Sequence, residues 1–141
     1  MKPRINLVTL GVADVPAARA FYQRLGFQAS PAGNDEVSFF DANGVVLALF
    51  GHDALAEDAG MDIHPAPSFR GASLAWNVGT EGEVDAVMAH AVSCGARLTK
   101  APHRMSWGGY AGYFSDPDGH LWEVAFNPFF PLSPQGQVQL P

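Results

Sequence analysis

The chain has 141 residues, the length of one compact domain with a substantial core. Its formal net charge of -6 argues against nucleic acid or an anionic membrane as the main partner, and its single cysteine excludes an internal disulfide and a cysteine-rich zinc site. A hydrophobic signal core and an apolar span of about 18 residues are both missing, so we expect a cytoplasmic protein.

The first half of the sequence predicts a strand, a helix and three further strands. A β-rich run over residues 5–12 precedes Asp14, a residue type that caps helix N-termini. Apolar residues then follow helical spacing until a glycine ends the helix: Ala18, Phe21, Tyr22, Leu25 and Gly26. Strand-like runs follow over 27–29, 37–40 and 45–50, and an Asp-Ala-Asn-Gly turn joins the last two.

The second half repeats this order of elements. Residues 72–78 are strand-like, and a helix that Gly95 closes is marked by Val84, Val87, Met88 and Ala91. A short run over 96–99 leads into a basic, aromatic segment over residues 100–109, which we expect to be a long loop.

A β-hairpin closes the second half, over residues 113–124. Its turn is Asp-Pro-Asp-Gly, and it aligns without gaps with the turn in the first half at an offset of 75 residues (119 − 44), which pairs Glu123 with Ala48. The shared turn and the shared element order predict an internal duplication.

A duplicated β-α-β-β-β chain ending in Asp-Pro-Asp-Gly-x-x-x-Glu resembles the vicinal oxygen chelate superfamily, which includes glyoxalase I, extradiol dioxygenases, fosfomycin-resistance thiol transferases and bleomycin-resistance proteins. The resemblance covers roughly residues 4–128. It rests on three motifs: Gly-Val-Ala-Asp (11–14), Phe21-Tyr22 with Leu25-Gly26-Phe27, and Tyr-Phe-Ser-Asp-Pro-Asp-Gly-His-Leu-Trp-Glu-Val (113–124).

The resemblance implies an α+β fold: two tandem βαβββ modules forming an open curved-sheet barrel around a central cleft. Within a single domain of residues 1–141, we expect module one at about 4–52, a linker at 53–70, module two at about 71–128 and a C-terminal arm at 129–141. We also expect a homodimer, because curved sheets leave strand edges to cover.

Superfamily members that do metal chemistry place one ligand early in the first strand of each module and another on its last strand. Carried over by position, the resemblance implies Leu7 and Ala48 in the first module, and Ser73 and Glu123 in the second. Leucine and alanine offer no donor atom to a divalent ion. We therefore expect no cofactor, and a divalent metal is the alternative.

The predicted ligand site follows from side-chain alternation along the strands and from the segment 100–109. Glu123 is the candidate catalytic residue: it acts as a general base, anchors an amine or hydroxyl of a ligand, or is a family relic held by a hydrogen bond. Trp107 is either part of a lid or a plug of the barrel. The full ligand-binding set is Thr9, Ser73, Asn77, His103, Arg104, Trp107, Tyr110, Phe114 and Glu123.

Two classes of function are open on the sequence alone. The first is a metal-free binding protein, similar to bleomycin-resistance members, that holds a small, partly aromatic or amphipathic molecule in a mostly apolar cleft. The second is an enzyme, either a divalent-metal lyase (glyoxalase-like) or dioxygenase, or a metal-free acid–base catalyst that uses Glu123. A cleft filled by its own side chains is a third alternative.

Overall fold

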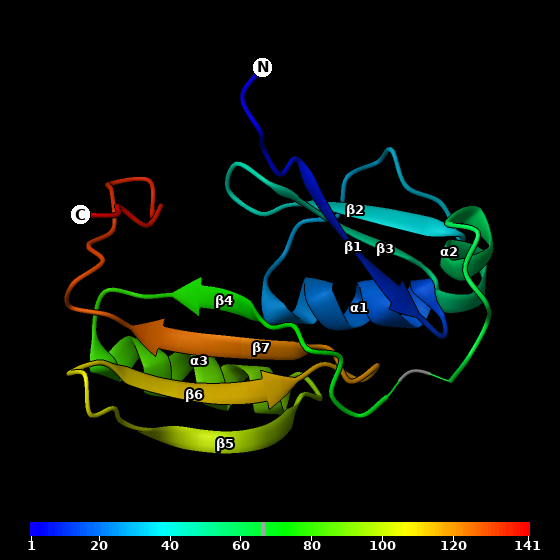
Figure 1. Cartoon of the computed structure of the whole chain (residues 1–141). Coiled ribbons are helices and arrows are strands. Elements are labelled where there is room, and N and C mark those ends of the chain that lie inside the picture. The colour runs from blue at the N-terminus through cyan, green and yellow to red at the C-terminus, as the bar shows by residue number, and fades with distance from the viewer. Residues whose placement is uncertain (66) are drawn as a thin grey trace. The chain divides into compact units, whose positions relative to one another are not determined.

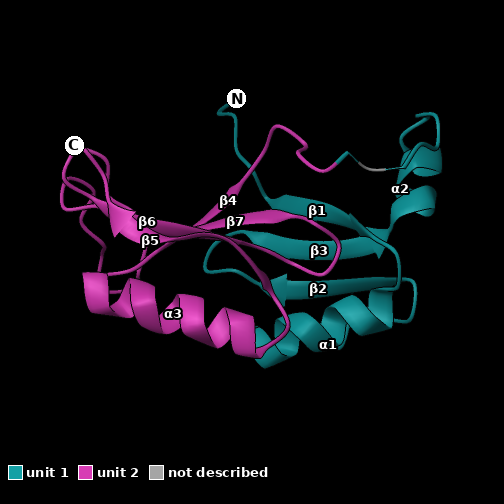
Figure 2. Cartoon of the chain, turned by 90° about the horizontal axis from the view of Figure 1, so that it is seen from below, with its two compact units in different colours: residues 1–67 teal, residues 68–141 magenta. Residues whose placement is uncertain are grey.

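The chain divides into two compact units, residues 1–67 and 68–141, which are coloured separately in Figure 2. The computed structural model describes residues 1–65 and 67–141. Each unit contains one β-sheet together with its helices. Within the described residues, no helix is long and apolar enough to cross a membrane.

The unit of residues 1–67 contains a three-stranded sheet in the order β1-β3-β2. Its elements are β1 (Leu7–Val12), α1 (Val15–Leu25), β2 (Val37–Asp41), β3 (Val46–Gly51) and α2 (His52–Asp58). β1 runs parallel to β3, and β2 runs antiparallel to it (Figure 1). The run predicted over 27–29 forms only an isolated bridge, Ala29 with Phe40. The sequence did not predict α2, a short helix without the long apolar stripe on which helix prediction depends.

The unit of residues 68–141 contains a four-stranded sheet in the order β4-β7-β6-β5. Its elements are β4 (Leu74–Asn77), α3 (Glu81–Ser93), β5 (Arg97–Arg104), β6 (Tyr110–Ser115) and β7 (Leu121–Phe126). β4 runs parallel to β7, and the other neighbouring strands are antiparallel. This is the βαβββ order, so the predicted α+β class with successive modules is confirmed. The joining of the two sheets into an open barrel stays a prediction.

The two long helices are capped at both ends, and Asp14, Gly26 and Gly95 lie at the ends that the sequence predicts. The Asp14 side chain accepts a hydrogen bond of 2.8 Å from the backbone N–H of Ala17, and Thr80 accepts one of 3.1 Å from Glu83 at the start of α3. The chain leaves both helices through glycines with positive φ, 120° at Gly26 and 107° at Gly95. The predicted apolar residues of α1 are buried, at 4% exposure or less: Ala18, Phe21, Tyr22 and Leu25.

Residues 100–109 are not the long loop that the sequence predicts. β5 continues to Arg104, and a short turn leads to β6 at Tyr110. Pro102 cannot donate a hydrogen bond to a sheet, but β5 is an edge strand, where proline is tolerated. Gly112 on the neighbouring strand makes room for it, since a Cβ at Gly112 would lie 2.9 Å from the backbone nitrogen of Pro102.

The last residues of the chain fold back on themselves. Leu132 forms an isolated bridge with Val138, and the backbone N–H of Ser133 donates to the carbonyl of Gln137 over 2.8 Å. Phe129 and Leu140 in this segment are exposed. The expected homodimer stays a prediction.

Candidate functional site

The sheet of residues 68–141 has one face against α3 and one face directed away from it. Cross-strand partners share a face, and Phe114 pairs with Trp122 while Tyr113 pairs with Glu123. Phe114 is fully buried, stacks on Trp122 with ring centroids 6.1 Å apart, and belongs to the core with the buried α3 residues Val84 and Met88. Tyr113 and Glu123 therefore lie on the opposite face, which we call the open face.

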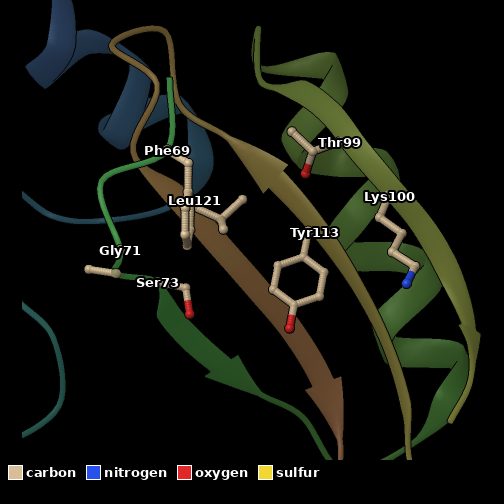
Figure 3. Close-up of a pocket in the computed structure, with 8 residues that line it drawn as sticks. Phe69, Gly71, Ser73, Thr99, Lys100, Tyr113 and Leu121 are labelled. Atoms are coloured by element: carbon tan, nitrogen blue, oxygen red, sulfur yellow. The ribbon is translucent and has the colours of Figure 1, made fainter. Parts of the chain in front are cut away.

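A pocket of about 470 Å³ lies on the open face (Figure 3). Its lining residues come from β5, β6, β7 and the segment that leads into β4: Phe69, Gly71, Ala72, Ser73, Thr99, Lys100, Tyr113 and Leu121. Figure 3 shows Tyr113 in the middle, with Phe69, Leu121 and Ser73 on one side and Thr99 and Lys100 on the other. The pocket thus has a polar side and a mainly apolar side, and Ser73 contributes the hydroxyl of the latter.

Tyr113 and Glu123 form the polar centre of this face. Burial, the negative charge of Glu123 and a hydrogen bond with its carboxylate raise the pKa of Tyr113 above its ordinary value of 10.0. Tyr113 is therefore protonated at neutral pH and donates to Glu123. The carboxylate is half-buried and lies opposite the phenol on the neighbouring strand.

Two adjacent residues of β5 line the same pocket, although neighbouring side chains of a regular strand point to opposite faces. The pairing with β6 shifts between Leu98 and Lys100, where two steps on β5 match one step on β6. This is a β-bulge at Thr99, and bulges change the direction of nearby side chains. The bulge explains how both Thr99 and Lys100 reach the pocket.

The wall formed by residues 69–73 is fixed to the β6–β7 turn through Arg70. Its Nη2 donates to the carbonyl oxygen of Asp118 over 2.5 Å, and its Nη1 lies 2.7 Å from Nδ1 of His120. The turn is itself ordered by Asp116, whose buried carboxylate accepts from the N–H groups of Asp118 and His120. Arg70 therefore connects the segment that carries Phe69 and Ser73 to this turn.

The structure brings only part of the predicted ligand-binding set to this pocket. Ser73 lines it. Asn77 lies on the open face, because its partner Ala125 is two residues from Glu123 on β7. His103 pairs with Ala111, on the same face as Tyr113, and its Nδ1 lies 3.2 Å from the carbonyl oxygen of Ala101. Thr9 belongs to the other unit, where it pairs with Ala48.

Three predicted placements were wrong. Phe114 faces α3 rather than Glu123, because the turn between β6 and β7 pairs it with Trp122. Tyr110 and Arg104 also serve α3: the Tyr110 hydroxyl donates to Asp85 over 2.7 Å, and Arg104 lies 3.3 Å from Glu81. These helix residues were not considered as partners in the sequence because they lie more than twenty positions away.

Trp107 lies in the β5–β6 turn, where its ring packs on the backbone of Gly109. A Cβ at Gly109 would lie 1.9 Å from the indole, so only glycine allows this contact. Trp107 is 43% exposed and does not line the pocket at Tyr113. The absence of a side chain at Gly109 thus allows the Trp107 ring to pack directly on the backbone.

The predicted ligand-binding set lacks several residues that line the pocket, among them Phe69, Thr99, Lys100 and Tyr113. The Asp-Pro-Asp-Gly motif alone does not give this pairing, since equal steps outward from residues 116–119 would put Gly112 opposite Glu123. The turn is instead closed by Asp116 and His120, and this places Tyr113 opposite Glu123. The bulge at Thr99 has no comparable signal in the sequence.

The residues at the family's metal-ligand positions do not fit a divalent ion. Leu7 and Ala48 share one face of the three-stranded sheet, and Ser73 and Glu123 share the open face of the other sheet. Two of these four side chains are aliphatic, and the Glu123 carboxylate is engaged by Tyr113. Across residues 1–65 and 67–141, no three His, Cys, Asp or Glu side chains cluster closely enough to hold a metal ion.

Comparison with solved structures shows many similar chains. A glyoxalase-related enzyme from Fulvimarina pelagi is 36% identical, with 97% of each chain covered and a TM-score of 0.89. A glyoxalase/bleomycin resistance protein/dioxygenase family enzyme from Burkholderia phytofirmans PsJN is 25% identical, over 86% of this chain and 96% of that one, with a TM-score of 0.74.

A lactoylglutathione lyase from Agrobacterium tumefaciens shares the fold, at 23% identity over 90% of this chain and 96% of that one, with a TM-score of 0.69. No curated protein matches the chain. The family model described as "Glyoxalase/Bleomycin resistance protein/Dioxygenase superfamily" matches residues 4–124. With this match and the 36% identity over nearly the full length, the chain belongs to the glyoxalase/bleomycin resistance protein/dioxygenase superfamily.

Proposed function

We propose that this chain binds a small, amphipathic or partly aromatic molecule in the pocket at Tyr113, without the divalent ion used by metal-dependent members of its superfamily. The observation that carries the proposal is the pocket's division into an apolar and a polar side around one central phenol. Binding sites for small molecules are typically concave and largely apolar, with a few polar groups that fix orientation.

The apolar side supports a flat ligand group. The Phe69 side chain is 68% exposed. Covering it with an apolar ligand group would be favourable, because burial of apolar surface stabilises the complex. Leu121 stands beside it in Figure 3. Gly71 and Ala72 also line the pocket, and their small size leaves space for a ring along this wall.

The metal-free part of the proposal is supported by the donor atoms at the superfamily's ligand positions. Leu7 and Ala48 provide none, and Glu123 already accepts a hydrogen bond from Tyr113. A single carboxylate and a neutral serine hydroxyl do not provide the several converging oxygen or nitrogen ligands that a divalent ion needs.

Calorimetric titration with three aromatic probes of one shape tests the binding proposal: phenylacetate, phenylacetamide and 2-phenylethylamine. We expect at least one probe to bind, and Phe69→Ala to weaken it by about two- to tenfold through the loss of an aromatic contact. Phe129→Ala is the matched control, since Phe129 is similarly exposed (62%) but does not line the pocket. Equal weakening by both substitutions, or no binding of any probe, would refute the proposal.

Acid–base catalysis by Glu123 is a second candidate function, favoured by the pairing of its carboxylate with Tyr113. In this case the carboxylate accepts a proton from carbon, and the Tyr113 phenol holds the carboxylate in position. NMR in D₂O would follow the exchange of carbon-bound hydrogen in a 1,3-dicarbonyl probe. Exchange above the buffer rate that Glu123→Gln abolishes would support catalysis, and an unchanged rate in the variant would exclude it.

A further inference from the structure

We infer that the ligand of the Tyr113 pocket carries an anionic group, an aromatic carboxylate being the simplest form, and that Lys100 selects for it. This inference rests on the proposed binding function and specifies the ligand's chemistry. It depends on three features of the described residues: the charges of the lining, the bulged course of β5, and the separation of the apolar side from the polar side.

Among the described residues, those that line the pocket include one cation and no carboxylate. Lys100 is its only ionisable group besides the Tyr113 phenol, which is protonated at neutral pH. Glu123 stands directly opposite Tyr113 but does not itself line the pocket, so Lys100 is the charge that a ligand in the pocket meets. Because the chain has a net charge of -6, long-range attraction does not bring anions here, and a local cation must do so.

The position of Lys100 on the open face is a result of how β5 is built. Lys100 lies directly opposite Tyr113, and the pairing of β5 with β6 shifts both before and after this point. Gly112 on β6 lets the bulged strand approach, since a Cβ there would lie 3.1 Å from the carbonyl oxygen of Lys100. The bulge before Lys100 also brings Thr99 to the pocket, so this side offers a hydroxyl as well as a cation.

The separation of the two sides defines the rest of the ligand. In Figure 3, Lys100 and Thr99 lie on one side of Tyr113, and Phe69 and Leu121 lie on the other. A molecule with a ring and a carboxylate a few bonds apart places its ring against Phe69 while its charge approaches Lys100. A cationic ligand would place its charge beside Lys100 or would have to displace the phenol from Glu123.

The three probes used for the binding proposal differ in charge and share their ring, so they also test the anion preference. We expect phenylacetate to bind more tightly than phenylacetamide, and both more tightly than 2-phenylethylamine. In Lys100→Gln the affinity for phenylacetate should fall by about two- to fivefold, the range of an exposed ion pair, while that for phenylacetamide stays unchanged. Lys100→Arg should retain the preference.

Lys2→Gln is the matched control, because Lys2 is the chain's only other lysine and does not line the pocket. It changes the net charge by the same amount as Lys100→Gln and should leave all three affinities unchanged. Equal affinity for the acid and the amide, a preference for the amine, or an acid preference that survives Lys100→Gln would overturn the inference while leaving the Phe69-dependent binding site intact. Failure of all three probes to bind would overturn the inference together with the proposed function.

Discussion

Tyr113 stands directly opposite Glu123 on neighbouring antiparallel strands, and its phenol and the carboxylate are hydrogen-bonded on the face of the sheet directed away from α3. Tyr110, three residues earlier on β6, bonds to Asp85 of α3 on the other face. The same strand thus presents one tyrosine–carboxylate pair to the pocket and another to the helix. The two pairs can be changed independently.

Spectrophotometric titration of the tyrosines should separate these pairs. The pKa of Tyr110 is raised, mainly by its hydrogen bond to Asp85, and the pKa of Tyr113 is raised by burial and by Glu123. Glu123→Gln should lower the pKa of Tyr113 and leave that of Tyr110 unchanged. Asp85→Asn is the converse control. If Glu123→Gln changed neither value, the pairing described here would be wrong.

The raised pKa values of these two tyrosines also predict that the free energy of unfolding falls at high pH. A pKa raised above 10.0 in the folded state means that the folded chain binds the phenol proton more tightly than the unfolded chain does. This contribution to the free energy of unfolding is fully present below the unfolded pKa and is lost as the pH rises through the folded values. Urea unfolding at pH values on either side of that range should show the loss, and Glu123→Gln should reduce it.

Gly112→Ala should destabilise the chain and disturb the pocket together. A methyl group at this position would lie 2.9 to 3.1 Å from backbone atoms of Pro102 and Lys100, so β5 must shift. We expect a loss of about 1–3 kcal/mol in the free energy of unfolding, typical of overpacking, and weaker binding of phenylacetate.

Gly82→Ala is the matched control for that substitution. Gly82 lies in α3 with no close neighbour to its Cβ position, so alanine should stabilise the helix by about 0.5–1 kcal/mol. Urea unfolding of both variants checks the pair. A Gly112→Ala variant as stable as the unchanged chain would contradict the close approach of β5 and β6.

Arg70→Met should loosen the wall of residues 69–73 without removing a lining side chain. The variant loses the contacts to the Asp118 carbonyl and to His120. We expect faster amide hydrogen exchange at residues 71–73, and a loss of about 1 kcal/mol in stability from the missing charge-assisted hydrogen bond. Arg97→Met, which alters an exposed arginine of β5, should change neither. Unchanged exchange in Arg70→Met would show that other contacts hold this wall.

Sequence reasoning identified features that depend on neighbouring residues. The Asp14 cap, the glycine exits of the helices and the turn at 116–119 are local, and each lies where the sequence predicted it. Features that depend on distant partners were missed. β5 runs through Pro102 only because Gly112 stands opposite, and Arg70 finds its partner 50 positions away at His120.

The candidate site was predicted less well than the fold for the same reason. Glu123 and Ser73 were assigned from the repeat, which fixes positions along a strand. Which residue of β6 lies on the same face as Glu123 depends on how the turn closes. Here that residue is Tyr113 and not Phe114, the residue that the sequence had predicted. The bulge that brings Lys100 and Thr99 to the pocket is a register shift between two strands, for which neither strand alone carries a signal.

Divalent ions should leave the thermal stability of the chain unchanged. A stabilising ion must bind the folded state more tightly than the unfolded state, and the aliphatic residues Leu7 and Ala48 give it no ligands. Melting curves with added Ni²⁺, Zn²⁺ or Mn²⁺ should coincide with the curve in chelator. A saturable rise in Tm that Glu123→Gln abolishes would favour a metal-dependent lyase or dioxygenase instead.

Mapping of amide and methyl chemical shifts during titration with phenylacetate tests the central claim most directly, because it locates the ligand as well as detecting it. The account predicts saturable shifts at pocket residues from all four wall segments: Ser73, Lys100, Tyr113 and Leu121. Residues on the α3 face, such as Tyr110 and Asp85, should not move, and Phe69→Ala should reduce the shifts throughout. Shifts confined to the α3 face or to the residue 129–141 segment, with the open face unchanged, would contradict a binding site at Tyr113.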